Sequence, residues 1–138
     1  MELLESPKLA YLLEASLEVL HFESNEWLSE IAFRKDETAF FQKILEKKAT
    51  KATSYEDKLE LEHLQNKIIH YRFEVLEDLK NSVLVHEKYL ANIIDYQVMD
   101  NDQIYREKHK AISDQMAGFE KEYKIIKKEL FRFAEELL

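Results

Sequence analysis

Two of the five histidines, His86 and His109, fall on apolar stripes of the sequence rather than among its charged residues. If a helical hairpin turns near residue 98, His86 lies level with residue 110 and therefore beside His109. Ser16 lies at a similar height on the first helical segment. We therefore expect Ser16, His86 and His109 to form a polar layer in the core, because buried polar groups must find hydrogen-bond partners and can fix the register of packed helices.

The same layer has a second interpretation, as a metal or small-ligand site. Imidazole and carboxylate groups suit zinc or iron, and Glu14, Glu18 or Glu87 would complete a site that contains both histidines. This interpretation makes His86, His109 and Glu18 weak metal candidates. The hydrogen-bonded layer is the simpler interpretation, so we expect no bound metal and no cofactor.

Two Glu-x-x-His motifs also have the spacing that metal sites in helical bundles use, namely Glu18 with His21 and Glu60 with His63. In an antiparallel hairpin the two motifs lie roughly 30 Å apart, because each helical residue adds about 1.5 Å of rise. They therefore cannot share one site within a chain.

No motif for catalysis is present. The chain has no cysteine, one glycine and one proline, which excludes thiol nucleophiles, disulfides and glycine-rich phosphate-binding loops. Its serines lack the context of a nucleophile elbow. We expect a protein that is not an enzyme and has no catalytic residue.

Composition limits the class of protein. With 138 residues, of which 46% are hydrophobic and 35% charged, the chain fits a single folded domain over residues 1–138. A net charge of -8 disfavours nucleic-acid binding. The uncharged stretches are too short to span a bilayer, and the first twenty residues carry four glutamates instead of a secretory signal. We expect an acidic, cytoplasmic protein that does not insert into membranes.

Cap signals divide the chain into three helices, and these helices would position the residues of the polar layer. The signals are Ser6 with Pro7, Thr53 with Glu56, and Asp100 with Gln103. The expected fold is all-α, an antiparallel up-down-up bundle of three long helices over residues 7–49, 54–95 and 101–138. The apolar pattern is weakest from His21 to Glu26, where Ser24 resembles an internal cap. The alternative is a four-helix bundle in which the first helix breaks near residues 22–25.

The apolar stripes are the clearest feature of these helices. The third segment has a heptad seam typical of a coiled coil, with apolar or histidine residues at steps of four and three. On the second segment the seam shifts by one residue between Val75 and Leu76, which would locally unwind a supercoil. Gly118 lies inside the third helix, where it would permit a close helix approach or a bend.

Apolar residues outside the seams suggest how the protein behaves. Phe33, Phe40 and Ile44 share one helix face beside the main stripe. They either thicken the core or form a self-association face, because exposed apolar patches of this kind usually mark interfaces. We expect a structural or protein-protein interaction module that forms a homodimer or binds another protein. The alternative is a metal- or small-ligand-binding bundle that uses the histidine layer.

Overall fold

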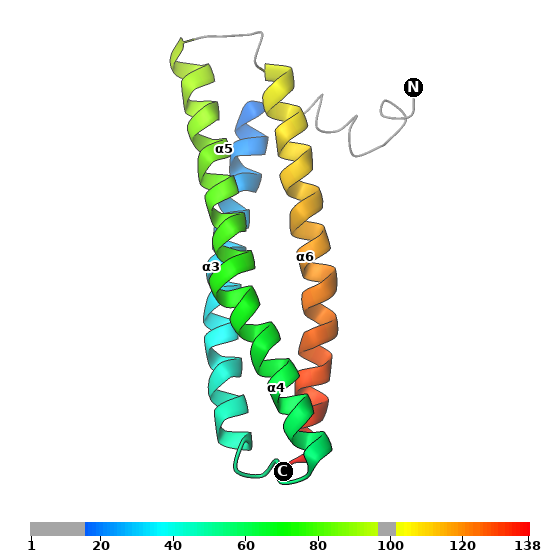
Figure 1. Ribbon diagram of the computed structural model, residues 1–138. Helices are drawn as coiled ribbons and strands as arrows, with labels where there is room; N and C mark the ends of the chain where they lie inside the picture. Colours follow the sequence, from blue (N-terminus) through cyan, green and yellow to red (C-terminus); the bar gives the residue numbers. More distant parts are fainter. Residues whose placement is uncertain (1–15, 97–101) are drawn as a thin grey trace, which may run out of the picture. The chain divides into compact units, whose positions relative to one another are not determined.

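The protein is all helical in the part of the chain that the structure, a computed structural model, describes, namely residues 16–96 and 102–138. Figure 1 shows the helices in chain order. They are α3 (Leu17–Lys48), α4 (Tyr55–His70), the π-helical turn η1 (Tyr71–Val75), α5 (Leu76–Tyr96) and α6 (Asp102–Glu136). Because α4, η1 and α5 follow one another without a break, they form one long helical segment. This segment, α3 and α6 are the three long helical segments that pack together. The expected helix starts near residues 7 and 101 lie outside the described residues.

Helix α3 is continuous from Leu17 to Lys48, so the break considered near residues 22–25 is absent. Ser16 stands just before the helix, and its hydroxyl accepts a hydrogen bond of 3.2 Å from the backbone N–H of Val19. This is the geometry of an N-cap side chain. Ser24 lies inside the helix and is fully buried, which excludes the role of an internal cap.

Helix α4 begins one residue later than the cap signal predicts. The N-cap is Ser54, whose hydroxyl accepts a hydrogen bond of 3.1 Å from the backbone N–H of Asp57. Thr53, the expected cap, is exposed. The backbone of Ser54 is extended, as an N-cap requires.

The one-residue shift of the apolar pattern becomes a change in the backbone. In η1 the backbone N–H of Leu76 donates to the carbonyl of Tyr71, five residues earlier. Tyr71 and Leu76 are both buried, whereas Val75 is half-buried. The π turn holds one extra residue, so the buried positions on both sides of it face the same way.

The seam expected on α6 is buried along almost its whole length. The buried residues are Tyr105, His109, Ile112, Met116, Phe119, Tyr123, Ile126, Leu130 and Phe133, and Leu137 is half-buried. Gly118 is exposed, and a Cβ added there would meet no atom within 4 Å. The expected close helix approach at Gly118 is therefore wrong.

The chain divides into two compact units. Unit 1 comprises Met1–Glu30 and Leu79–Ala117, and unit 2 comprises Ile31–Asp78 and Gly118–Leu138. Parts of α3 and α6 belong to each unit. The expectation of a single domain over residues 1–138 stays a prediction.

Each unit has its own core. In unit 1, the buried residues Leu20, Leu90 and Tyr105 form a cluster. In unit 2, the ring of Tyr71 meets the rings of Phe119 and Tyr123 edge-on, at centroid distances of 5.6 and 5.7 Å. Such edge-to-face pairs are among the favoured geometries of aromatic packing.

Candidate functional site

A chain of hydrogen bonds crosses the core of unit 1. Nε2 of His86 lies 3.0 Å from Nδ1 of His109, and Nε2 of His109 lies 3.3 Å from Oε1 of Glu23. His86 on α5 and His109 on α6 are buried, with 3% and 0% of their surfaces exposed. The chain therefore joins one side chain from each of α3, α5 and α6.

The carboxylate fixes the direction of these hydrogen bonds. An ionised carboxylate only accepts, so Nε2 of His109 carries the proton shared with Glu23. If both imidazoles are neutral, Nδ1 of His109 accepts from Nε2 of His86. Nδ1 of His86 is then a buried acceptor, and it has no hydrogen-bond partner.

Aromatic rings hold both imidazoles in place. The ring of His86 stacks on Tyr105 with a centroid distance of 4.1 Å and an interplanar angle of 1°. Trp27 packs against His109 at a centroid distance of 4.4 Å. Rotation of either imidazole would disrupt both a hydrogen bond and a ring contact, so the layer is preorganised.

Burial controls protonation in this layer. Burial, with smaller contributions from the nearby His109 and Lys108, lowers the pKa of His86 to about 4, because a buried cation loses hydration. Burial and the charge of Glu87 raise the pKa of Tyr105. His86 is therefore neutral at neutral pH.

The polar layer differs in one member from the layer expected from the sequence. Ser16 is exposed because it caps α3, so its inclusion was wrong. Ser24 lies in the core instead, buried beside Tyr105. Neither hydroxyl forms a hydrogen bond of good geometry, although Ser24 lies close enough to lower the pKa of Tyr105 in part.

The sequence contained a signal for Ser24 that we did not use. Leu20, Ser24, Trp27 and Ile31 follow one another at steps of four, three and four, which is the spacing of a buried stripe. Following the spacing instead of the polarity would have identified Ser24 as a core position and Trp27 as a neighbour of the layer.

The weak metal candidates do not form a cluster. Glu18 is exposed, and Glu87 pairs with His21 instead of joining His86 and His109. Glu14 lies outside the described residues. Within residues 16–96 and 102–138, no group of three or more potential metal ligands is close enough to hold an ion.

A groove of about 460 Å³ in unit 1 has His86 in its wall. Val85 and Ile112 contribute apolar surface, and Lys108 contributes a positive charge. The Lys108 ammonium lies 4.5 Å from the centre of the Tyr89 ring, within the range of a cation-π contact. The groove therefore combines an apolar wall with one cationic group.

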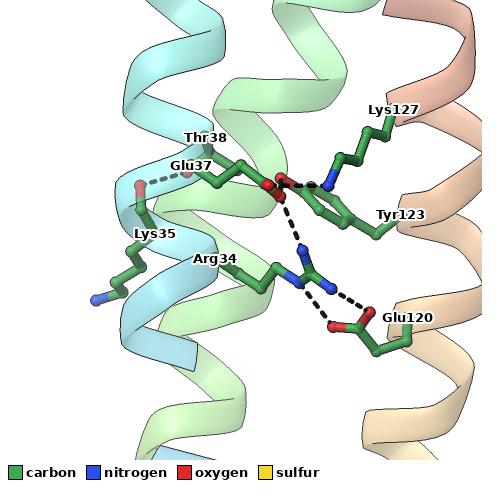
Figure 2. A network of polar contacts seen from close by, with 7 residues as sticks. All are labelled: Arg34, Lys35, Glu37, Thr38, Glu120, Tyr123 and Lys127. Atoms are coloured by element: carbon green, nitrogen blue, oxygen red, sulfur yellow. Dashed lines mark hydrogen bonds and ion pairs between the residues drawn. The ribbon is translucent and has the colours of Figure 1, made fainter. Parts of the chain in front are cut away.

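Unit 2 contains a charged network that the sequence analysis did not identify (Figure 2). Arg34 donates two hydrogen bonds, of 2.9 and 2.8 Å, to the two carboxylate oxygens of Glu120. It donates a third, of 2.9 Å, to Glu37. Glu37 also accepts from Tyr123 at 2.7 Å and from Lys127 at 2.9 Å. The network thus links α3 to α6 by bidentate and shared hydrogen bonds.

Electrostatics favour the ionised forms of this network. Burial raises the pKa of Glu37, but hydrogen bonds from Lys127, Tyr123 and Arg34 outweigh it, so the pKa falls below its ordinary value. The hydrogen bond to Glu120 raises the pKa of Arg34. Each charge therefore has a compensating partner, as partly buried ions require.

The expected self-association face lies on the outside of unit 2. Phe33 and Phe40 are 57% and 59% exposed, and Ile44 is half-buried. Phe131 of α6 is 44% exposed, and its ring meets the buried ring of Phe41 at a centroid distance of 5.5 Å. We call Phe33, Phe40, Ile44 and Phe131 the α3/α6 face.

Comparison with protein families, with curated proteins and with solved structures finds no match to this chain. None of the helices in the described ranges is long and apolar enough to cross a membrane. Function must therefore be inferred from the two polar sites, the groove and the α3/α6 face.

Proposed function

We propose that the protein is a non-enzymatic helical interaction module of the cytoplasm that self-associates through the α3/α6 face. The observation that carries this proposal is the exposure of Phe33 and Phe40, each by more than half of its surface. Burying such side chains is favourable by roughly 25 cal/mol for each Å² of apolar area. A contiguous apolar patch on a charged surface usually marks an interface.

We also propose the antiparallel up-down-up topology for the bundle. Within unit 2, residue numbers increase in the same direction along α3 and α6, since Arg34 meets Glu120 and Lys48 donates to the carbonyl of Leu137. Along α3 and the second helical segment, residue numbers run in opposite directions, since Lys35 pairs with Glu77 and Gln42 pairs with Arg72. These pairings support α3 and α6 as the two parallel helices and the second segment as the antiparallel one.

Sedimentation velocity tests the self-association. We expect a dimer at tens of micromolar for the wild type and at least tenfold weaker association for Phe40→Ser, because a two-fold dimer buries each phenylalanine twice. Phe73→Ser is the matched control, since Phe73 in η1 is also 57% exposed but lies outside the α3/α6 face. A wild-type monomer at these concentrations, or equal effects of the two variants, would reject the proposed interface.

A second candidate function is small-ligand binding in the groove beside the histidine layer. The observation that favours it is a groove lined by the Lys108 cation and by His86, whose buried Nδ1 has no hydrogen-bond partner. The anionic aromatic dye 1-anilinonaphthalene-8-sulfonate is a suitable probe. We expect its binding to be lost in Lys108→Glu and retained in the control Lys88→Glu, which changes an exposed lysine outside the groove. Equal binding to both variants would reject this candidate.

A further inference from the structure

We infer that the second copy docks on the α3/α6 face in an antiparallel orientation, with α3 packed against α3 of the other chain. This inference rests on the proposed self-association and adds its geometry.

Heptad spacing defines the layers of such a pair. Phe33 and Phe40 are seven residues apart, and Ile44 follows Phe40 by four, so these residues occupy d, d and a positions of one heptad frame. Glu37 is the other a position. In an antiparallel pair, a positions meet d positions, so Phe33 of each chain packs on Ile44 of the other. The axis then passes between residues 38 and 39.

Glu37 is compatible with this interface even though it carries a charge. In the same register, Phe40 of one chain meets Glu37 of the other. The carboxylate of Glu37 already accepts hydrogen bonds from Arg34, Tyr123 and Lys127 within its own chain. Its charge is therefore compensated before a second copy arrives.

The charges beside the face favour the antiparallel orientation. Asp36 and Lys43 are exposed and occupy successive g positions of this frame. In an antiparallel pair, g positions meet g positions, which brings Asp36 of each chain beside Lys43 of the other and forms two ion pairs. A parallel pair would instead bring g positions beside e positions, which places Asp36 beside Phe41 and Lys43 beside Lys48 of the other chain, so neither ion pair would form.

Charge reversal tests this pairing by sedimentation velocity. Asp36→Lys or Lys43→Asp alone converts two attractive contacts into two repulsive ones, and we expect dimerisation about tenfold weaker. The double variant Asp36→Lys with Lys43→Asp restores both ion pairs and should recover wild-type affinity. An equimolar mixture of the two single variants should also recover it. Glu62→Lys, at an exposed position of α4, is the control and should leave the affinity unchanged.

Cross-linking reports the orientation independently of charge. Because the chain has no cysteine, Asp36→Cys and Lys43→Cys each introduce a single thiol. A short bismaleimide should cross-link a mixture of the two variants much faster than either variant alone. In a parallel dimer, residues 36 and 43 of the two chains would lie about 10 Å apart along the helix axis, so the mixture would cross-link no faster than the single variants.

The outcomes separate this inference from the proposed function. A dimer that is insensitive to both charge reversals, or whose mixed cysteine variants cross-link no faster than either variant alone, overturns the antiparallel pairing and leaves self-association standing. A wild-type chain that stays monomeric overturns both. Circular dichroism of each variant excludes unfolding as the cause of lost association.

Discussion

Units 1 and 2 bury polar side chains in opposite ways. In unit 1, several buried polar atoms have no hydrogen-bond partner, whereas in unit 2 Arg34 and Glu37 each have several partners. Among the described residues, the buried polar atoms without a hydrogen-bond partner all lie in unit 1, and they are Ser24 Oγ, His86 Nδ1, Glu87 Oε1 and the hydroxyl oxygen of Tyr105. An unpaired buried polar group costs about 1–3 kcal/mol. Unit 1 is therefore the unit whose core retains unused hydrogen-bonding capacity.

The difference shows that the same kind of apolar helix seam can hold either uncharged histidines or ion-paired side chains. In unit 2, the carboxylates of Glu37 and Glu120 are paired with Arg34 and Lys127, so the edge of the core accommodates charged groups. In unit 1, a charge on His86 has no compensating group in hydrogen-bonding contact. The two units should respond differently to pH, to the loss of one partner and to backbone changes.

Acidification should have the largest effect, and it should act on unit 1 first. The pKa of His86 is lowered from 6.5 to about 4 in the folded chain, so the unfolded chain binds the proton first. The stabilisation is complete above pH 6.5 and is lost as the pH falls towards 4, by about 3 kcal/mol in total. The pKa of Glu37 lies below 4.5, so the unit 2 network loses stability only at lower pH.

Urea unfolding followed by fluorescence measures this effect, because the single tryptophan, Trp27, lies in unit 1 against His109. We expect about 2 kcal/mol of loss between pH 7.5 and pH 5. Amide exchange at pH 5 should show lower protection in unit 1 than in unit 2. A free energy of unfolding that is constant over this range would contradict the neutral, buried state of His86.

Removing one cation should have the next largest effect, in unit 2. Arg34→Met leaves Glu120 without its bidentate partner and removes one donor from Glu37. We expect a loss of about 2 kcal/mol, less than for a fully buried pair because the Glu120 side chain keeps 24% of its exposure. The measurement is urea unfolding followed by circular dichroism. Arg132→Met, at an exposed position of α6, should change stability by less than about 0.5 kcal/mol.

Removing one histidine should cost less, and removing both should recover part of the loss. His109→Leu leaves the Nε2–H of His86 without an acceptor in the core, which costs about 1–2 kcal/mol. Adding His86→Leu removes the unpaired donor and the group that titrates. We expect the double variant to be more stable than His109→Leu and to lose the pH dependence between 7.5 and 5. Additive losses in the double variant would argue against direct coupling of the two histidines.

The sequence predicted the seams well because burial on a helix depends on local spacing. The α6 stripe and the one-residue shift before Leu76 are both visible as steps between apolar residues, and each residue of a helix makes its backbone hydrogen bonds locally. The shift did not reveal that the backbone would absorb it as a π turn. The π turn forms only if it allows both Tyr71 and Leu76 to pack in the core, which depends on the neighbouring helices.

The polar sites were harder to predict because they depend on contacts between helices. His86 and His109 stood out as polar residues on apolar stripes, but Ser16 was chosen over Ser24 from an estimated register. The pairing of Arg34 with Glu120 had no distinctive signal, since charged residues make up 35% of this chain and many of them could pair. Only the relative rotation of α3 and α6 brings that pair together.

The smallest expected effect concerns the backbone at Gly118, the first α6 residue of unit 2. Glycine inside a helix costs about 1 kcal/mol relative to alanine, because the unfolded chain loses more freedom on folding. A Cβ at this position would meet no atom within 4 Å, so Gly118→Ala should stabilise the protein by that amount. Ala117→Gly, at the neighbouring exposed position in unit 1, should destabilise it equally, and the swapped double variant should match the wild type in urea unfolding. If Gly118→Ala instead destabilises the chain, α6 must need the conformational freedom of glycine at this position.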